Sequence, residues 1–432
     1  MHPTLNSDRL SASRSMFHII ILLIIFTPGH LLEWGVERAL VAITSILSIY
    51  YIAKFTHPGQ EAFFSTKTLF IYFSTVQLFY AISFLIGVGG ATASQAATRD
   101  YYEMLRFMIY FLYAALIFRA FRHENVPPFT KIIYATIGFS AIVAAIYIVR
   151  VPYISGFLEG VIYADTRDNL SDLLTGGRTR FTAPFPNANY LAYFLCMAIT
   201  YLLFYVSSSP RYLISILAIG LLYLTGSRTG WIVGGIVLTV WGFAHLLQSL
   251  KSPKFSSVLA QIIFASIFLV LISFLFEYFA TSTRVSELSK AINSRDLFLV
   301  DSFSHRVNEY FYLLTYVSKS LLFGWGPSKE NIGYIIDNQY LLWILRHGFL
   351  GFFLIIFGAV ALFFKMWKSA KGDLVGKFGI VAFAIVVALF LLTGAFLNNF
   401  RLFFITVLFA AAMIASKQRV RSNEGVHHRY AS

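Results

Sequence analysis

Runs of apolar residues about as long as a bilayer is thick recur along the whole chain, and they constrain its fold more than any other feature. A helix needs about 20 mostly apolar residues to cross the hydrocarbon core. Within lipid, each segment must pair its own backbone N–H and C=O groups, so each run is expected to be a helix. Only 12% of the 432 residues are charged, against about 25% in soluble domains. The sequence therefore predicts an all-α, polytopic transmembrane helical bundle that forms a single membrane domain, residues 1–432.

Twelve apolar runs are predicted to span the membrane. They cover residues 16–33, 37–54, 66–88, 103–121, 130–150, 188–207, 211–225, 229–248, 256–279, 341–365, 375–397 and 401–416. The polar stretch from Met1 to Ser15 leads directly into these spans, so we expect a retained signal anchor and not a cleaved leader. The connections between spans are mostly short, as antiparallel neighbours require.

Two connections are long, residues 151–187 and residues 280–340. Long loops tend to carry function. In the second loop, apolar residues from Tyr310 to Leu321 recur at helical spacing, which predicts an amphipathic helix between His305 and Leu322. We expect this helix to lie on the surface of the membrane domain.

The distribution of charge predicts the orientation of the chain. With twelve spans both termini lie on one side. If that side is the cytoplasm, the inner segments hold just over half of the 34 Lys and Arg residues but a minority of the 20 Asp and Glu residues. This is the positive-inside pattern. It accounts for the net charge of +14 without a nucleic-acid partner, and it places both long loops on the outer face.

Several familiar sites are missing from the sequence. There is one cysteine, Cys196, so no disulfide can form within the chain. We find no Walker A loop, no G-x-G-x-x-G, no Asp-x-Asp pair and no spacing typical of a zinc site. We therefore expect neither a metal nor a nucleotide cofactor.

Arginine and amide side chains cluster at the outer ends of the predicted spans. They are Arg178, Arg180, Asn187 and Asn189 before the sixth span, Arg228 in the glycine turn 225–230, Arg306 at the start of the surface helix, Asp337, Asn338 and Tyr340 at the start of the tenth span, and Arg401 at the start of the twelfth. The arginine fork matches phosphate oxygens, and glycine turns let backbone N–H groups approach an anion. The pattern predicts a site that binds a phosphate or pyrophosphate group.

Each of these residues also has a simpler interpretation. Arg228 could be an interfacial anchor, Arg306 could pair with Glu309 on the same helix, and the asparagines could be helix caps. Capping does not exclude a role in catalysis. As a working assignment, Arg228 and Arg306 stabilise the pyrophosphate, whereas Asp337 or its neighbour Asn338 positions or deprotonates an acceptor hydroxyl.

The motifs and their order resemble those of the bacterial O-antigen ligase and O-antigen polymerase superfamily. The turn Thr225-Gly226-Ser227-Arg228-Thr229-Gly230 looks like its S-R-x-G signature. Arg306, followed by 323–327, 337–341 and 348–351, resembles its second block, and 187–192 resembles a third. The resemblance implies an inner-membrane enzyme whose periplasmic face transfers oligosaccharide from an undecaprenyl-pyrophosphate-linked glycan donor to a glycan or lipid-linked acceptor. Membrane lipid is an implied partner, and a chain-length regulator is a further candidate.

Within this superfamily, two branches and one rival class stay open. Ligases carry a His-Asn pair where this chain has Asp337-Asn338, and the R-x10-G pattern of some polymerases is missing. We favour a polymerase, with ligation to lipid A–core as the alternative. A polysaccharide flippase is the rival class, but transporters usually place ionisable groups near mid-membrane on matching halves. A direct displacement without metal would invert the anomeric centre.

Overall fold

The structure is a computed structural model. It describes residues 4–27, 37–55, 65–89, 105–121, 129–149, 153–154, 180–185, 187–250, 294, 301–318, 320–326, 338–394 and 396–430. The side chains of some residues in these ranges, among them Arg306, lie outside the description. All regular elements in the described ranges are helical, which confirms the predicted all-α class.

The bounds of the helices are as follows. They are α1 (Thr4–Phe26), α3 (Glu37–Phe55), α4 (Thr66–Gly89), α6 (Arg106–Ala120), α7 (Phe129–Val149), α9 (Ala188–Tyr205), α10 (Pro210–Leu224), α11 (Arg228–Leu250), α14 (Asp301–Val317), α15 (Gln339–Ser369), α16 (Leu374–Thr393), the 3-10 turn η6 (Phe396–Asn398) and α17 (Phe400–Tyr430).

The predicted spans correspond closely to these helices. In the described residues, α4, α7, α9, α11, α15 and α16 are long and apolar enough to cross a membrane, and α1, α3, α10 and α17 contain shorter apolar segments. Helix α6 matches the predicted span 103–121. The predicted span 256–279 lies outside the described residues. The chain is thus a polytopic helical membrane protein.

Some element boundaries were predicted wrongly. Helix α1 already begins at Thr4, within the stretch we took as a polar lead-in. The surface helix α14 runs over Asp301–Val317 and not to Leu322. Its end is set by serines that bond to the backbone, since the Ser318 hydroxyl donates to the Thr315 carbonyl at 2.9 Å and the Ser320 hydroxyl to the Gly324 carbonyl at 2.7 Å.

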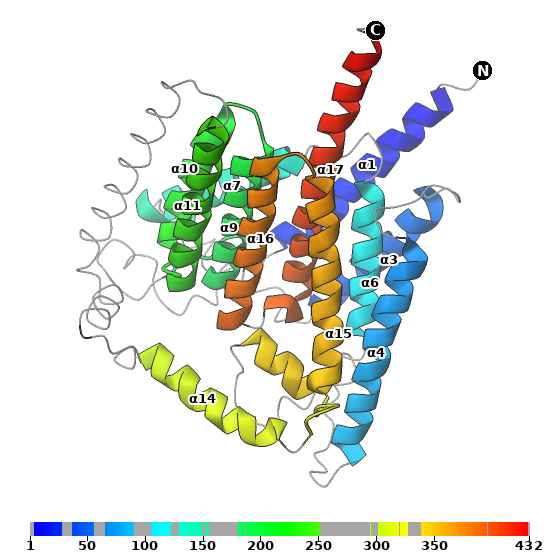
Figure 1. The fold of residues 1–432 in the computed structure, drawn as a ribbon, viewed down its shortest axis with the longest axis vertical. Helices are drawn as coiled ribbons and strands as arrows, with labels where there is room; N and C mark the ends of the chain where they lie inside the picture. Colours follow the sequence, from blue (N-terminus) through cyan, green and yellow to red (C-terminus); the bar gives the residue numbers. More distant parts are fainter. Residues whose placement is uncertain are drawn as a thin grey trace.

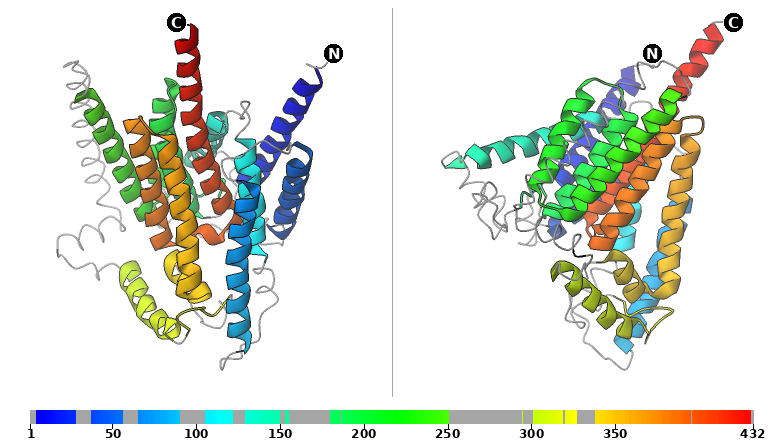
Figure 2. Two further views of the ribbon diagram at one scale, coloured as in Figure 1. Left: turned by 45° about the vertical axis from the view of Figure 1, so that its right-hand side comes forward. Right: turned by 60° about the vertical axis from the view of Figure 1, so that its left-hand side comes forward.

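Helices α9 and α17 form the centre of the bundle. Almost every side chain of α9 is buried, and α17 packs against α6, α9 and α15. The described ends of the chain, at Thr4 and Tyr430, lie at the same end of the bundle (Figure 1). Helix α14 lies across the opposite end in all views (Figures 1 and 2). The bundle therefore has one face near the termini and one face near α14, which we call the α14 face.

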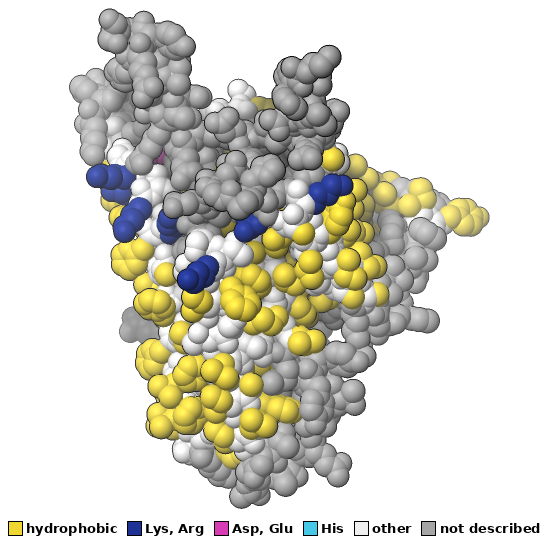
Figure 3. All heavy atoms as spheres, turned by 90° about the vertical axis from the view of Figure 1, so that its right-hand side faces the viewer, with side chains coloured by type: hydrophobic (Ala, Val, Ile, Leu, Met, Phe, Trp, Pro, Cys, Tyr) yellow, Lys and Arg dark blue, Asp and Glu magenta, His cyan; other side chains and the backbone are white. Residues whose placement is uncertain are grey.

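Basic side chains gather toward the end that carries the termini. Figure 3 shows a band of Lys and Arg at that end, above a surface of apolar side chains. Lys54 and Lys368 lie in the last turns of α3 and α15 there, and Arg119 donates to the Thr66 hydroxyl at 2.6 Å. These basic side chains therefore lie at the end of the bundle that also carries the termini.

Candidate functional site

The segment 180–189 and the turn between α10 and α11 are joined by a network of hydrogen bonds at the α14 face. Arg180 donates from Nε to the Thr225 carbonyl at 3.0 Å and from Nη2 to Asn189 Oδ1 at 2.6 Å. The Ser227 hydroxyl donates to the same Asn189 oxygen at 3.0 Å. The Phe181 N–H donates to the Leu224 carbonyl at 3.0 Å. Asn189 thereby holds two segments that are remote in sequence.

Local chemistry explains the shape of the turn. Gly226 has φ +58°, a conformation that glycine adopts without steric cost. The Thr225 hydroxyl accepts from the Ser227 N–H at 3.2 Å, and the Ser227 hydroxyl accepts from the Gly230 N–H at 3.2 Å, which caps α11. Arg228 is therefore the first residue of α11 and not part of the turn itself, and its side chain is partly buried.

Close packing of α11 against α9 and α10 keeps Arg228 beside this network. A Cβ atom at Gly230 would lie 2.9 Å from the Ala192 side chain and 2.9 Å from the Leu222 side chain. The small residue thus lets the first turn of α11 approach both neighbours. Arg180 and Arg228 consequently lie on adjoining segments, with Asn189 and Ser227 between them.

Arg401 is a buried connection on the other side of segment 180–189. Its side chain is 5% exposed, and it donates from Nη2 to the Thr27 carbonyl at 2.6 Å and from Nη1 to the Pro184 carbonyl at 3.5 Å. Its guanidinium also lies 5.9 Å from the ring centre of Phe185. Arg401 therefore ties the end of α1 to the start of α17, which makes its role structural at least in part.

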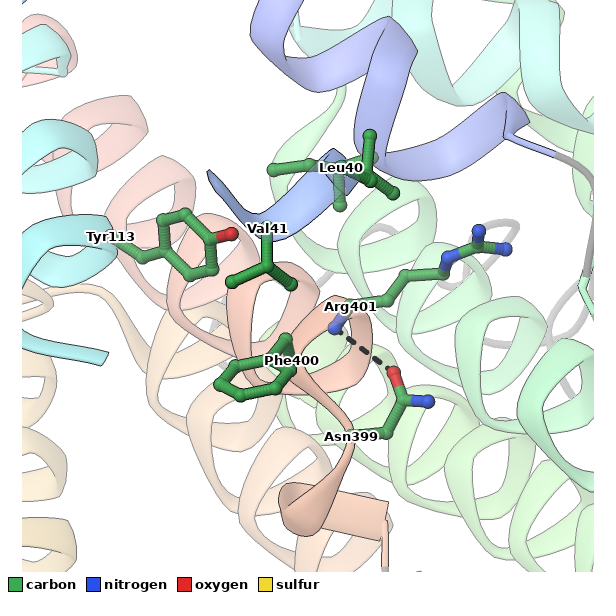
Figure 4. A pocket seen from close by; sticks show the side chains of 7 residues that line it. Leu40, Val41, Tyr113, Asn399, Phe400 and Arg401 are labelled. Carbon is green, nitrogen blue, oxygen red and sulfur yellow. Dashed lines mark hydrogen bonds between the residues drawn. The ribbon is translucent and has the colours of Figure 1, made fainter. Parts of the chain in front are cut away.

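A small pocket opens beside Arg401. It is lined mostly by apolar residues of α1, α3, α6 and α17, together with Asn399. The guanidinium of Arg401 points away from it (Figure 4), and Asn399 Oδ1 accepts from the Arg401 N–H at 2.9 Å as the cap of α17. This pocket has no cation turned into it, so it is not the anion site that the arginine pattern predicts.

The glycine motifs form a main-chain clamp between the segment after α14 and a break in α15. The Trp325 and Gly326 N–H groups donate to the carbonyls of Leu345 and Arg346 at 2.7 and 3.0 Å. The Phe349 and Leu350 N–H groups donate in turn to the carbonyls of Leu321 and Leu322, at 2.9 and 3.3 Å. These four bonds give the Phe349 and Leu350 N–H groups and the Leu345 and Arg346 carbonyls the partners that an unbroken helix would supply.

Glycine is required at the clamp because the two backbones nearly touch. Gly348 has φ +63° and ψ −175°, and a Cβ atom there would lie 2.1 Å from the Leu322 carbonyl oxygen. A Cβ atom at Gly324 would lie 2.5 Å from the Gly348 nitrogen, and one at Gly326 would lie 2.7 Å from Phe84 Cα. The predicted second block is therefore in large part a structural device that fixes the first two turns of α15.

Asn338 and Tyr340 are placed by the first turn of α15. Asn338 is buried and caps the helix, since its Oδ1 accepts from the Leu341 N–H at 3.1 Å. Its Nδ2 donates to the Tyr310 hydroxyl of α14 at 3.0 Å. The Tyr340 hydroxyl donates to the Ala388 carbonyl of α16 at 3.1 Å. The bond from Asn338 to Tyr310, together with the packing of buried Leu313 against Leu342, attaches α14 to the end of the bundle.

Two buried arginines at this face were not among the site residues predicted from the sequence. Arg106, the first residue of α6, lies 5.8 Å from the ring centre of Phe400, and Arg346 lies in the short part of α15 before its break. Both are more than nine-tenths buried. Both had been counted as parts of predicted spans. An arginine near the outer end of a span is a signal that could have identified them.

Some of the predicted site residues lie outside the part of the chain that the structure describes. Asp337 and Arg178 lie outside the described residues, and so does the side chain of Arg306. The backbone of Arg306 is in α14, on the α14 face. Asn187 caps α9 by accepting from the Asn189 N–H at 2.8 Å, and its side chain is exposed. Asn189, for which capping was the simpler interpretation, is not the cap.

The arrangement of charge at the α14 face is electrostatically unusual. Arg106, Arg228 and Arg401 are the first or second residues of α6, α11 and α17. The N-terminal end of a helix carries partial positive charge, so a cation there is disfavoured and an anion is stabilised. Cations and helix N-termini gathered at one face together form a region suited to bind an anion of high charge density, such as a phosphate.

The chain was compared with known protein families. Residues 213–356 match the family described as O-antigen ligase. The matched region is about a third of the chain and runs from α10 to the middle of α15, so it includes Arg228, α14, the glycine clamp and Asn338. No match was found among curated proteins. The match confirms, for the region from α10 to the middle of α15, the resemblance drawn from the motifs: this part of the chain is similar to the O-antigen ligase family.

Proposed function

We propose that this protein is a surface-polysaccharide polymerase of the O-antigen type, which transfers an oligosaccharide from undecaprenyl pyrophosphate to a second lipid-linked glycan. The reaction takes place at the α14 face, which on the positive-inside rule is the periplasmic side of the bacterial inner membrane. The similarity of residues 213–356 to the O-antigen ligase family supports a lipid-linked glycan substrate. The choice of polymerase over ligase rests on Asp337 preceding Asn338 where ligases carry histidine.

The observation that carries the proposal is the gathering of arginines and helix N-termini at one face. The leaving group of the transfer is a pyrophosphate, whose negative charge grows as the glycosidic bond breaks. Arg228, with Arg306 and Arg180, holds that pyrophosphate, and the positive end of α11 adds to the stabilisation. Arg180 is already held by hydrogen bonds to the Thr225 carbonyl and to Asn189, so it needs little reorganisation during the reaction.

Residues at the start of α15 activate the hydroxyl group of the acceptor. Asp337 takes the proton from the acceptor hydroxyl as the new bond to the anomeric carbon forms, and Asn338 keeps this turn in place through its cap and its bond to Tyr310. The carrier-lipid pyrophosphate leaves from the opposite face of the sugar. A single displacement of this kind inverts the anomeric centre and requires no metal ion.

A transport function is less well supported by the same geometry. Transporters usually hold ionisable groups near the middle of the membrane on broken helices. Arg106, Arg228 and Arg401 instead lie at the starts of helices. The break in α15 near Arg346 is closed by main-chain hydrogen bonds. The site therefore suits chemistry at the membrane surface.

The test is complementation of a strain that lacks the gene, with glycan analysed on gels. Arg228→Ala and Arg306→Ala, each at normal membrane levels, should reduce chain formation on the order of 100-fold or more. Lys368→Ala, which removes an exposed cation at the opposite end of the bundle, is the matched control and should leave it unchanged. Full activity in both arginine variants would refute the proposal.

The phenotype of the deletion separates the candidate functions. Loss of a polymerase leaves single repeat units on the cell surface. Loss of a ligase leaves polymer attached to the carrier lipid, and loss of a flippase leaves repeat units inside the cell. Only the first result agrees with the polymerase proposal.

A further inference from the structure

A second cluster of polar side chains lies at the other end of the bundle, between α10 and α11. Arg211 and Ser215 are one turn apart on α10, and Trp241 and His245 are one turn apart on α11. The rings of Trp241 and His245 are 5.0 Å apart between centroids, and the Tyr212 ring lies 6.3 Å from Trp241. The Arg211 guanidinium lies 4.5 Å from the centre of the Tyr212 ring. We call Arg211, Ser215, Trp241 and His245 the α10–α11 cluster.

Three atoms of the cluster are buried without a hydrogen-bond partner in the described part of the chain. They are Arg211 Nε, Ser215 Oγ and His245 Nε2. Many buried serine and threonine hydroxyls of the bundle donate to the carbonyl one turn earlier, as Thr136 and Ser140 do at 2.9 Å. Ser215 does not, although it is only 3% exposed. Desolvated polar atoms of this kind normally have a partner, such as water or a ligand.

The chemistry of the three atoms identifies the kind of partner. Arg211 Nε can only donate, and the hydroxyl of Ser215 and the imidazole of His245 can also donate. The other nitrogens of Arg211 are engaged, with Nη1 donating to the Val206 carbonyl and Nη2 to the Tyr212 hydroxyl. A partner of Arg211 Nε must therefore supply an acceptor, which beside a guanidinium is best stabilised when it carries negative charge. Further oxygens of the same partner can accept from Ser215 and His245. Phosphate oxygens have both properties.

The location of the cluster indicates where such a phosphate comes from. Arg211 lies at the start of α10, directly after exposed residues 207–210. Helix α10 begins at the end of the bundle that carries the termini (Figure 1). Tyr212 and Trp241 have the amphipathic rings that are typical of the membrane–water interface. We propose that the α10–α11 cluster binds the phosphate of an anionic phospholipid headgroup, in the leaflet opposite the α14 face.

This proposal is independent of the glycan-transfer reaction, so its test uses lipid binding by the purified full-length protein. Native mass spectrometry in a neutral detergent measures the affinity for phosphatidylglycerol, with phosphatidylcholine and inorganic phosphate as comparison ligands. The wild type should bind phosphatidylglycerol more tightly than either. Arg211→Gln and Ser215→Ala should each weaken that binding by about tenfold, which is the effect of one lost hydrogen bond to a charged group.

Lys368→Gln is the matched control, because it removes an exposed cation at the same end of the bundle outside the cluster. It should leave the affinity unchanged. Equal losses in all three variants would mean that general surface charge attracts the lipid and would overturn the proposal. Equal affinity for phosphatidylcholine or for inorganic phosphate would overturn the assignment to an anionic headgroup. Ser215→Ala removes one atom only, so it keeps the test valid if Arg211→Gln does not fold.

Discussion

Replacing Gly348 by alanine should open the clamp that fixes the start of α15. The native φ of +63° with ψ of −175° is a conformation that only glycine adopts readily, and a side chain there costs about 1–3 kcal/mol. The new Cβ atom would also lie 2.1 Å from the Leu322 carbonyl oxygen, so one backbone must move. The residues around Asn338 should then lose their fixed position.

The size of the effect follows from the bonds at the clamp. A shift large enough to relieve the contact breaks the two bonds from Phe349 and Leu350 to the carbonyls of Leu321 and Leu322. Each backbone hydrogen bond contributes about 0.5–1.5 kcal/mol. Together with the strain, the clamp should lose roughly 2–6 kcal/mol. A loss of about 4 kcal/mol changes the ratio of closed to open states by roughly a thousandfold.

Two measurements check this prediction. Gly348→Ala should lower the midpoint of thermal unfolding in detergent and should abolish glycan chain formation in cells. Gly235→Ala is the matched control, because a Cβ atom at Gly235 in α11 meets nothing within 4 Å and alanine favours a helix by up to about 1 kcal/mol. Wild-type unfolding and activity in Gly348→Ala would refute the reasoning, because the backbone contact could then not be as close as the structure has it.

Two further predictions concern side-chain bonds of the same face. Arg401→Lys should lower the free energy of unfolding by about 1–3 kcal/mol, because a single ammonium cannot reproduce the fork that joins the carbonyls of Thr27 and Pro184; unchanged denaturation in detergent would contradict this. Tyr310→Phe should weaken the attachment of α14 by about 1 kcal/mol through loss of the bond from Asn338. Hydrogen exchange should then rise in α14 and stay constant in α9, and equal exchange in wild type and variant would argue against that role.

The sequence by itself determined the fold class, most of the span boundaries and the partition of charge. Each of these follows from a local property, because about 20 consecutive apolar residues suffice to specify a membrane helix. The candidate site was predicted in part for the same reason. Arg180, Asn189, Arg228, Asn338 and Arg401 could be placed at one face from their positions at the ends of helices, and the structure locates all five there.

Only the tertiary structure decided what these residues do to one another. Asn189 could equally have been a helix cap, and its bonds to Arg180 and Ser227 depend on how α9 packs against α11. The role of Gly348 depends on a backbone that approaches it from residues 321–326. The partners in these contacts are separated by up to tens of residues, and their pairing is selected by packing of the whole bundle. No local pattern in the sequence encodes that choice.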